Sequence, residues 1–228
     1  MLIDGGADLD LVATKLAALG IRRIDVMVAT HPHADHIAGL AAVLARYPTG
    51  LVLDPGCPAQ TPYYGAFVRA VRASGVPFRH PRPPERLLVG DLTVSVLAPQ
   101  HCFFGTDSDP NNDSVVLHVS SGDGSILFTG DVEEPAQAEL LADYARSVRA
   151  AVLKVPHHGG NTNLPAFLGA IHAGVAVVSV GPNRYGHPVP SVLATLRRDG
   201  MRVYRTDHAG DVTVEFDRGK VLIESSRA

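Results

Sequence analysis

Residues 28–40 read Val-Ala-Thr-His-Pro-His-Ala-Asp-His-Ile-Ala-Gly-Leu. Four side chains that can bind a metal fall within six positions of this stretch, namely His31, His33, Asp35 and His36. An apolar run at residues 24–29 precedes them and predicts a buried strand, and the alanine-rich run at residues 37–47 predicts a helix. We therefore expect the four side chains on a strand-to-helix loop, where a fixed scaffold can turn several of them toward one point.

The spacing of these side chains suits two cations held close together. His31 and His33 are two residues apart, so an extended backbone directs both imidazoles to the same side. Asp35 and His36 follow after the chain has turned and can reach a second point. Imidazole and carboxylate ligands favour zinc, manganese or iron. A histidine-rich surface turn is the alternative, because the chain has 11 histidines, but the dense grouping favours a metal site.

Length and charge limit the classes of function that remain. The chain has 228 residues, enough for one large α/β domain or two small ones. Its formal net charge of −3 provides no global basic field for nucleic acid, so polyanion binding would need a local patch or bound metals. We find no apolar run of membrane-spanning length and no signal peptide at the start of the sequence.

Cys57 and Cys102 are the two cysteines of the chain. A pair of cysteines neither demands nor excludes a disulfide. The absence of a Cys-Xaa-Xaa-Cys pair excludes a zinc ribbon. We expect both residues to be small, unpaired side chains that pack as hydrophobic groups.

Hydrophobic periodicity alternates strands with helices along most of the chain. Predicted strands cover residues 1–6 (in part), 24–29, 51–54, 87–98 (a hairpin), 115–120, 125–129, 151–155, 175–180, 203–205, 211–216 and 220–224. Predicted helices cover residues 8–19, 37–47, 63–74, 134–144, 164–171 and 191–199. Strands that end in His- or Asp-bearing loops and lead into helices predict sheets with helices outside.

A proline-rich segment, residues 80–86, carries arginines at 79, 82 and 86. We interpret it as a stiff, solvated loop, and a phosphate-contacting edge is the alternative. His80 and His101 are lone histidines, a class of residue that seldom binds metal.

The pattern His-Xaa-His-Xaa-Asp-His after a strand resembles the signature of the metallo-β-lactamase superfamily. The whole chain resembles the metallo-β-lactamase-like domain of the ComEC/Rec2 family of competence DNA-uptake proteins. This resemblance implies a single α/β domain over residues 1–228, a four-layer αββα sandwich with pseudo-halves of about 1–100 and 111–228. The family pattern begins with two further strands joined by a Gly-Gln-Gly-Asp-like turn. We expect the domain to lack these first two N-terminal strands, through truncation or a misplaced start, with a cost in stability.

The resemblance also implies a set of metal ligands, which are His31, His33, Asp35, His36, Asp131 and His187. Asp131 ends a strand in Thr-Gly-Asp and matches the aspartate that bridges two metals, although a turn or helix-capping aspartate is the alternative. His187, in Tyr-Gly-His-Pro, matches the last histidine ligand. Two divalent ions, zinc or manganese, are the expected cofactors.

Further residues have roles implied by the same resemblance. His157 and His158 match a Lys-Val-Pro-His-His-Gly stretch and, with Asp35, are the catalytic candidates. One should be a ligand or phosphate contact and the other a packing or supporting residue, and the sequence does not say which. Supporting or substrate-contacting roles fall to Asp4, Asn112, Ser114, Lys154, Asn183 and Asp207.

One departure from the superfamily pattern concerns the first metal. Where many members have a histidine ligand, this chain reads Asn111-Asn112-Asp113-Ser114. The site formed by His31, His33 and Asp131 is therefore expected to be open and weak, which favours manganese or exchangeable zinc. Alternatively, Asn112 or Ser114 contacts a substrate phosphate.

These observations predict a metal-dependent hydrolase that uses a metal-activated hydroxide on a phosphodiester. The resemblance implies a nuclease for single-stranded DNA in DNA uptake, with DNA and the membrane channel of a ComEC-like protein as partners. Hydrolysis of a small phosphodiester, a phosphorylcholine ester or a lactone is an alternative, because fold does not choose the substrate. A non-catalytic binding module is another. The location would be extracytoplasmic within ComEC and cytoplasmic for a free-standing protein.

Overall fold

A computed structural model describes residues 1–227 of the chain. Its contacts divide the chain into two compact units. Unit 1 comprises Met1–Arg82 together with Pro99–Val115, and unit 2 comprises Pro83–Ala98 together with the chain from Val116 onward. The chain therefore passes from unit 1 to unit 2 and back before it completes unit 2.

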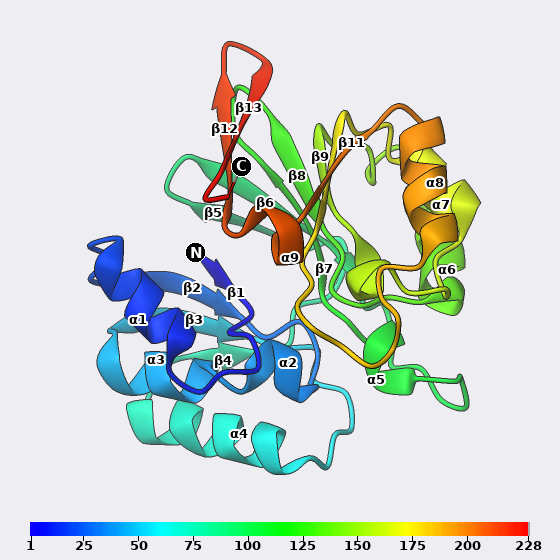
Figure 1. Ribbon diagram of the computed structural model, residues 1–228. Helices are drawn as coiled ribbons and strands as arrows, with labels where there is room; N and C mark the ends of the chain where they lie inside the picture. Colours follow the sequence, from blue (N-terminus) through cyan, green and yellow to red (C-terminus); the bar gives the residue numbers. More distant parts are fainter. Residues whose placement is uncertain (228) are drawn as a thin grey trace. The chain divides into compact units, whose positions relative to one another are not determined.

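Unit 1 contains a four-stranded parallel sheet in the order β1-β2-β3-β4 (Figure 1). The strands are β1 (Leu2–Ile3), β2 (Ile24–Val28), β3 (Thr49–Leu53) and β4 (Phe78–Arg79). The helices are α1 (Leu11–Ala18), α2 (Ala34–Ile37), α3 (Leu40–Arg46), α4 (Pro62–Ser74) and α5 (Asp109–Asn112). Because all four strands run in one direction, their carboxyl ends meet at one edge of the sheet. The metal-competent loop begins at this edge, after β2.

The core of unit 1 joins the sheet to its helices. Met27 of β2, Leu40 of α3 and Phe67 of α4 belong to one buried hydrophobic cluster and have no exposed surface. The start of α4 is capped by Thr61, whose hydroxyl accepts a hydrogen bond from the Tyr64 backbone N–H at 3.1 Å. The same hydroxyl donates to the carbonyl of Pro32 at 3.3 Å, which ties α4 to the metal-competent loop.

The single helix predicted over residues 37–47 is wrong in detail, since α2 and α3 are separate helices. Gly39 lies between them, where the chain passes against the turn after β1. A Cβ at Gly39 would lie 2.4 Å from the carbonyl oxygen of Gly5, so only glycine allows this approach. The turn of α2 places Asp35 and His36 on helical backbone.

Cys57 and Cys102 form a disulfide, with their Cα atoms 5.6 Å apart. The expectation of two unpaired cysteines is therefore wrong. Periodicity could not reveal the pairing, because the residues are 45 positions apart and meet only when Pro99–Val115 returns to unit 1. The bond joins this returning segment to the loop that follows β3.

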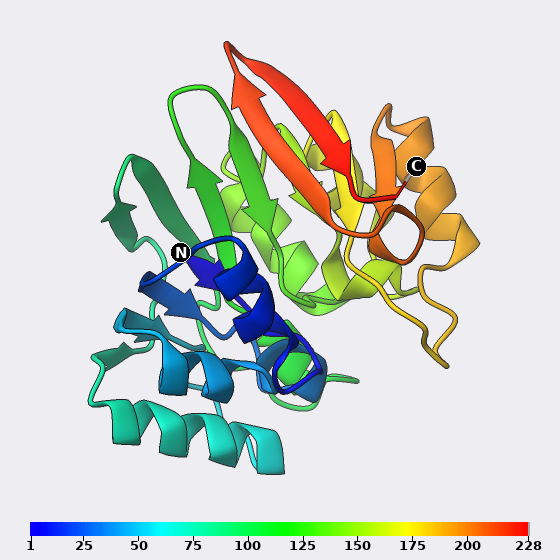
Figure 2. The same ribbon diagram turned by 60° about the vertical axis from the view of Figure 1, so that its left-hand side comes forward.

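Unit 2 contains a seven-stranded mixed sheet in the order β11-β10-β9-β8-β7-β6-β5. Its strands are β5 (Arg86–Val89), β6 (Leu92–Ala98), β7 (Val116–Ser120), β8 (Ser125–Phe128), β9 (Val152–Lys154), β10 (Val175–Val178) and β11 (Arg202–Arg205). Strands β5 to β8 pair antiparallel and β8 to β11 pair parallel. A separate hairpin, β12 (Val212–Asp217) and β13 (Lys220–Ser225), forms the red ribbon in Figure 2.

The helices of unit 2 are α6 (Glu134–Tyr144), α7 (Pro165–Ala170), α8 (Pro190–Arg198) and α9 (Thr206–Ala209). A short 3-10 turn occupies Pro156–Gly159, between β9 and α7. The α/β class predicted from the sequence is confirmed, and α6 has the predicted bounds. The short helix α9 was not among the helices predicted from the sequence. In the described part of the chain, no helix has the length and apolarity needed to cross a membrane.

Candidate metal centre

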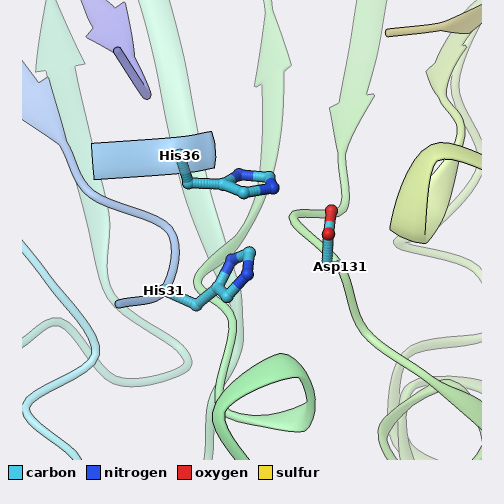
Figure 3. Close-up of side chains that lie close together, drawn as sticks. All are labelled: His31, His36 and Asp131. Carbon is cyan, nitrogen blue, oxygen red and sulfur yellow. The ribbon is translucent and has the colours of Figure 1, made fainter. Parts of the chain in front are cut away.

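The unit 1 half-site is the group His31, His33, Asp35 and His36. His31 lies on the loop that leaves β2, and His36 lies on α2 (Figure 3). His33 immediately precedes α2 in extended conformation, and Asp35 occupies the first turn of that helix. An extended segment followed by a helical turn thus presents the four side chains. The prediction that all four lie on the loop before the helix is wrong for Asp35 and His36, which lie on α2.

The imidazoles of this half-site crowd together. His31 Nε2 lies 3.1 Å from His33 Nδ1, and the ring centroids of His31 and His36 are 4.1 Å apart. His31 is 1% exposed and His36 is 3% exposed, whereas the Asp35 side chain is 53% exposed. Ring nitrogens this close share either a proton or a cation. A donor set of three imidazoles and a carboxylate fits zinc or manganese.

Asp4 and Thr30 hold the half-site from behind. Asp4 Oδ2 accepts hydrogen bonds from His36 Nδ1 at 2.7 Å and from the Thr30 hydroxyl at 2.8 Å. Asp4 Oδ1 accepts from the Thr30 backbone N–H at 2.8 Å. With Nδ1 donating to the carboxylate, His36 keeps Nε2 for a metal, which is the usual arrangement of a metal-binding histidine.

The segment that replaces the expected histidine also lies in unit 1. Asn112 is 0% exposed, and its amide nitrogen donates to Thr106 Oγ1 at 3.1 Å and to the Ser108 carbonyl at 3.2 Å. Ser114 is likewise fully buried. Burial raises the pKa of the neighbouring Asp113 carboxyl, which accepts a hydrogen bond from the Phe103 N–H at 2.7 Å. The amide nitrogen of Asn112 therefore holds its own loop, and its assignment to a metal or phosphate stays a prediction.

The unit 2 half-site is the group Asp131, His157, His158 and His187. Asp131 follows β8 and is 2% exposed (Figure 3). Lys154 Nζ lies 3.1 Å from Asp131 Oδ1 and donates to the Gly130 carbonyl at 2.6 Å. His158 Nε2 lies 3.2 Å from the other oxygen, Asp131 Oδ2. The buried carboxylate is thus flanked by a lysine and an imidazole.

His157 and His158 have different surroundings, which the sequence could not distinguish. His158 Nδ1 donates to the Ser179 carbonyl at 2.7 Å, and its other nitrogen faces Asp131. His157 Nδ1 lies 3.1 Å from Glu133 Oε1 and 3.0 Å from Thr162 Oγ1. Both histidines have positive φ, 46° and 51°, a conformation that costs free energy in non-glycine residues and is common at functional sites.

His187 is held by backbone contacts. Asn183 accepts a hydrogen bond from the His187 N–H at 3.1 Å and donates to its carbonyl at 2.8 Å. The ring of His187 lies 5.1 Å from that of His157, and a Cβ on Gly160 would lie 2.8 Å from its Cε1 atom. His187 Nδ1 is a buried nitrogen without a hydrogen-bond partner among the described residues, which suits a metal ligand. Burial, followed by the charges of His157 and His158, lowers the His187 pKa.

The remaining supporting candidate, Asp207, pairs with Arg205, whose Nη2 lies 2.7 Å from Asp207 Oδ2. This guanidinium lowers the pKa of the Asp207 carboxyl.

The sequence prediction missed Thr30 and Glu133. Thr30 follows the apolar run at residues 24–29, Glu133 comes two residues after Asp131, and each is 5% exposed or less. Only their position in the sequence could have identified them, because each lies within two residues of a predicted ligand.

Comparison with known proteins defines the class of this protein. Residues 1–181 match the model of the metallo-beta-lactamase superfamily, and the chain belongs to that superfamily of metal-dependent hydrolases. The fold agrees with Tm1679, a metal-dependent hydrolase of the beta-lactamase superfamily, with a TM-score of 0.57 and 13% identity over 98% of this chain and 88% of that one.

Curated relatives refine the class. The chain is 31% identical over 204 residues to ComE operon protein 3 of Bacillus subtilis (strain 168). The aligned region covers 88% of this chain and 26% of that protein. It is 32% identical over 223 residues to Competence protein ComA of Neisseria gonorrhoeae. That aligned region covers 95% of this chain and 29% of that protein. The chain thus spans less than a third of the length of these relatives. The predicted resemblance to the competence family is confirmed.

Proposed function

We propose that this protein is a two-metal phosphodiesterase that cuts single-stranded DNA. The observation that carries the proposal is the donor set of the two half-sites. Buried imidazoles and carboxylates are oriented by partners such as Asp4 behind His36. The competence proteins among its relatives support DNA as the substrate. The membrane channel of a longer ComEC-like protein stays a predicted partner.

The predicted ligands divide between two ions. His31, His33 and Asp131 would hold the first ion, and Asp35, His36, Asp131 and His187 would hold the second. When bound, zinc or manganese ions supply an activated water and neutralise charge on a phosphoryl oxygen. His187 Nδ1 has no hydrogen-bond partner among the described residues, and His31 approaches His33 to 3.1 Å; both observations support this assignment.

The chain's own groups would orient the substrate and move protons. Asp35, with its carboxylate exposed, would orient the attacking water. His157 has Nδ1 beside Glu133, so its Nε2 can deliver a proton to the leaving oxygen. His158 faces Asp131 and would contact the phosphate or an ion.

The decisive experiment measures cleavage of a single-stranded oligonucleotide by purified protein, stripped with a chelator and then reloaded with manganese or zinc. Activity should vanish on stripping and return on reloading. His33→Ala should abolish cleavage, whereas His208→Ala, which changes a side chain that is 71% exposed, should not. Cleavage by His33→Ala at the parent rate would refute the proposal.

Parallel assays resolve the alternatives. A small phosphodiester, a phosphorylcholine ester and a lactone are offered to the same preparation. Faster turnover of one of these than of DNA would reassign the substrate. Elemental analysis that finds no bound metal after reloading would indicate a non-catalytic module.

A further inference from the structure

Unit 1 contains a second polar cluster that the metal chemistry does not use. Asp54, at the end of β3, is 0% exposed. Its carboxylate accepts hydrogen bonds from Tyr64 Oη at 2.6 Å, from His80 Nδ1 at 2.5 Å and from the Gly56 N–H at 3.0 Å. Burial, with the hydrogen bond to Asp54, raises the pKa of Tyr64, so this phenol stays a donor. The Asp54 cluster is defined here as Asp54, Gly56, Tyr64 and His80.

His80 is the exposed member of the Asp54 cluster. Its side chain is 49% exposed, although Nδ1 is anchored to a fully buried carboxylate. The other ring nitrogen, Nε2, has no hydrogen-bond partner in the part of the chain that the structure describes. When the ring carries both protons, Nε2–H is a fixed donor to a ligand in solution.

The local backbone is shaped around this imidazole. Gly56 has a φ of 64°, and a Cβ on it would lie 2.4 Å from His80 Cγ. The glycine therefore leaves the space that the ring occupies. Phe78 contacts the ring edge-on, with the ring centroids 5.1 Å apart. The orientation of His80 is thus fixed by Asp54, by the room at Gly56 and by Phe78.

The Asp54 cluster lies at the same sheet edge as the unit 1 half-site. Asp54 follows β3 and His80 follows β4, while the metal loop follows β2, the other neighbour of β3. Two strand spacings place the end of β4 about 10 Å from the end of β2. The hydrogen bond from Thr61 to Pro32 connects α4, which carries Tyr64, to the metal loop.

Two cationic residues flank His80 in the sequence. Arg79 precedes it, and Arg82 follows two residues later. The carboxylate of Asp54 already accepts three hydrogen bonds and is 0% exposed. Arg79 and His80 are exposed, so an anion can approach them from solvent. An exposed, oriented imidazole with arginines one residue before it and two residues after it in the sequence suits a phosphate oxygen.

We infer that His80, positioned by Asp54, binds a phosphate of the DNA strand flanking the bond that is cut. This inference rests on the proposed nuclease function and deepens it, because it assigns a substrate-binding residue outside the metal ligands. His80 would contribute to binding of a polymer and leave the chemical step alone. A small phosphodiester, which has no flanking phosphate, would not reach it.

The test compares His80→Ala with the parent on a single-stranded oligonucleotide and on a small phosphodiester. Loss of the hydrogen bond to a phosphate should raise the oligonucleotide KM about tenfold with kcat unchanged. Both constants for the small diester should stay at parent values. The slope of log KM against log salt should fall by about 0.7, since one phosphate contact to a single strand is lost.

Three further variants separate binding from folding. Gly56→Ala, which displaces the ring while His80 remains, should raise the oligonucleotide KM as His80→Ala does. His80→Lys should retain part of the affinity, because the lysine side chain supplies a donor and a charge for the phosphate. Arg23→Ala, which removes an exposed cation near the start of β2, at the opposite edge of the sheet, should change neither constant.

The outcomes distinguish this inference from the proposed function. If His33→Ala is inactive while His80→Ala keeps the parent KM on the oligonucleotide, the phosphate contact is refuted and the nuclease stands. If His80→Ala lowers the rate of cleavage of both substrates equally, the role of His80 lies in folding or in the chemical step, and the inference is overturned. If His33→Ala cuts DNA normally, the proposed function itself fails.

Discussion

Asp4 Oδ2 lies 2.7 Å from His36 Nδ1, and Asp4 has a positive φ of 61°. The backbone of Asp4 thus has a conformation that few residues other than glycine, asparagine and aspartate adopt. We predict that Asp4→Asn, which keeps that backbone, weakens metal binding about 10–100-fold. The reason is that an amide has one acceptor oxygen and cannot replace both carboxylate oxygens, of which Oδ1 accepts from the Thr30 N–H and Oδ2 from His36 and the Thr30 hydroxyl. Metal titration followed by calorimetry measures the change.

Asp25→Asn is the matched control for Asp4. Asp25 is exposed and pairs with Arg23 at 2.8 Å, near the start of β2 and not at the end of the strand that leads to the ligands. It should bind metal as the parent does. Equal affinities for all three proteins would show that Asp4 does not orient His36.

The pair of glutamates after Asp131 offers an internal comparison. Glu133 is 5% exposed and lies 3.1 Å from His157 Nδ1, whereas the adjacent Glu134 is exposed at the start of α6. We predict that Glu133→Gln lowers kcat on DNA about tenfold or more, because His157 loses the charged partner that orients it. Glu134→Gln should retain the parent kcat. Steady-state kinetics on the two variants provide the test, and a parent-like kcat for Glu133→Gln would count against the role given to His157.

Most elements of the fold could be predicted because their hydrophobic periods are strong and local. The run at Val175–Val178 is β-branched, and α6 begins beside Pro135 and follows a helical pattern. The features that failed are non-local. The break at Gly39 depends on the approach of Gly5, and the disulfide depends on the return of Pro99–Val115 to unit 1. No sequence window contains both partners of either contact.

The residues of the candidate site also fall into a group that could be predicted from local sequence and a group that could not. Ligands that share a dense motif, such as His31 and His33, could be predicted from spacing alone. Residues that act through a neighbour could not, because Thr30 and Glu133 have no motif of their own. The difference between His157 and His158 arises from the turn at Pro156–Gly159, whose positive φ values separate the two rings.

The Cys57–Cys102 bond should contribute measurably to stability. It closes a loop of 45 residues, for which the chain-entropy model predicts a gain of about 4 kcal/mol in the free energy of unfolding. The double variant Cys57→Ser with Cys102→Ser should unfold at lower urea concentration. A reductant should destabilise the parent and leave the variant unchanged. Identical urea midpoints for the parent with and without reductant would contradict the prediction.

His118 predicts a pH dependence of stability. Burial lowers its pKa from the ordinary value of 6.5, although its hydrogen bond to the Arg149 carbonyl acts in the opposite direction. The unfolded chain therefore binds a proton at higher pH than the folded one. Stability from this group is present above 6.5 and is lost as the pH falls from 6.5 toward the lower folded pKa.

Urea unfolding at about pH 7.5 and about pH 5.5 checks this sign. The loss of stability on acidification should be smaller for His118→Gln, which keeps a donor for Arg149 and has no proton to gain. His208→Gln, at an exposed position, should lose as much stability on acidification as the parent does. An equal loss for His118→Gln and the parent would show that His118 does not contribute.

The loop that carries His187 provides the last prediction. The side chain of Asn183 forms hydrogen bonds with both the backbone N–H and the backbone carbonyl of His187. It therefore closes the turn between Asn183 and His187. Asn183→Ala should let this turn move and weaken binding of the second metal about tenfold, with little change in the unfolding midpoint because Asn183 is exposed. Arg184→Ala changes an exposed neighbour in the same turn and should retain parent affinity. Metal titration of the two variants decides, since equal affinity would mean that His187 keeps its place without Asn183, or that it is not a ligand.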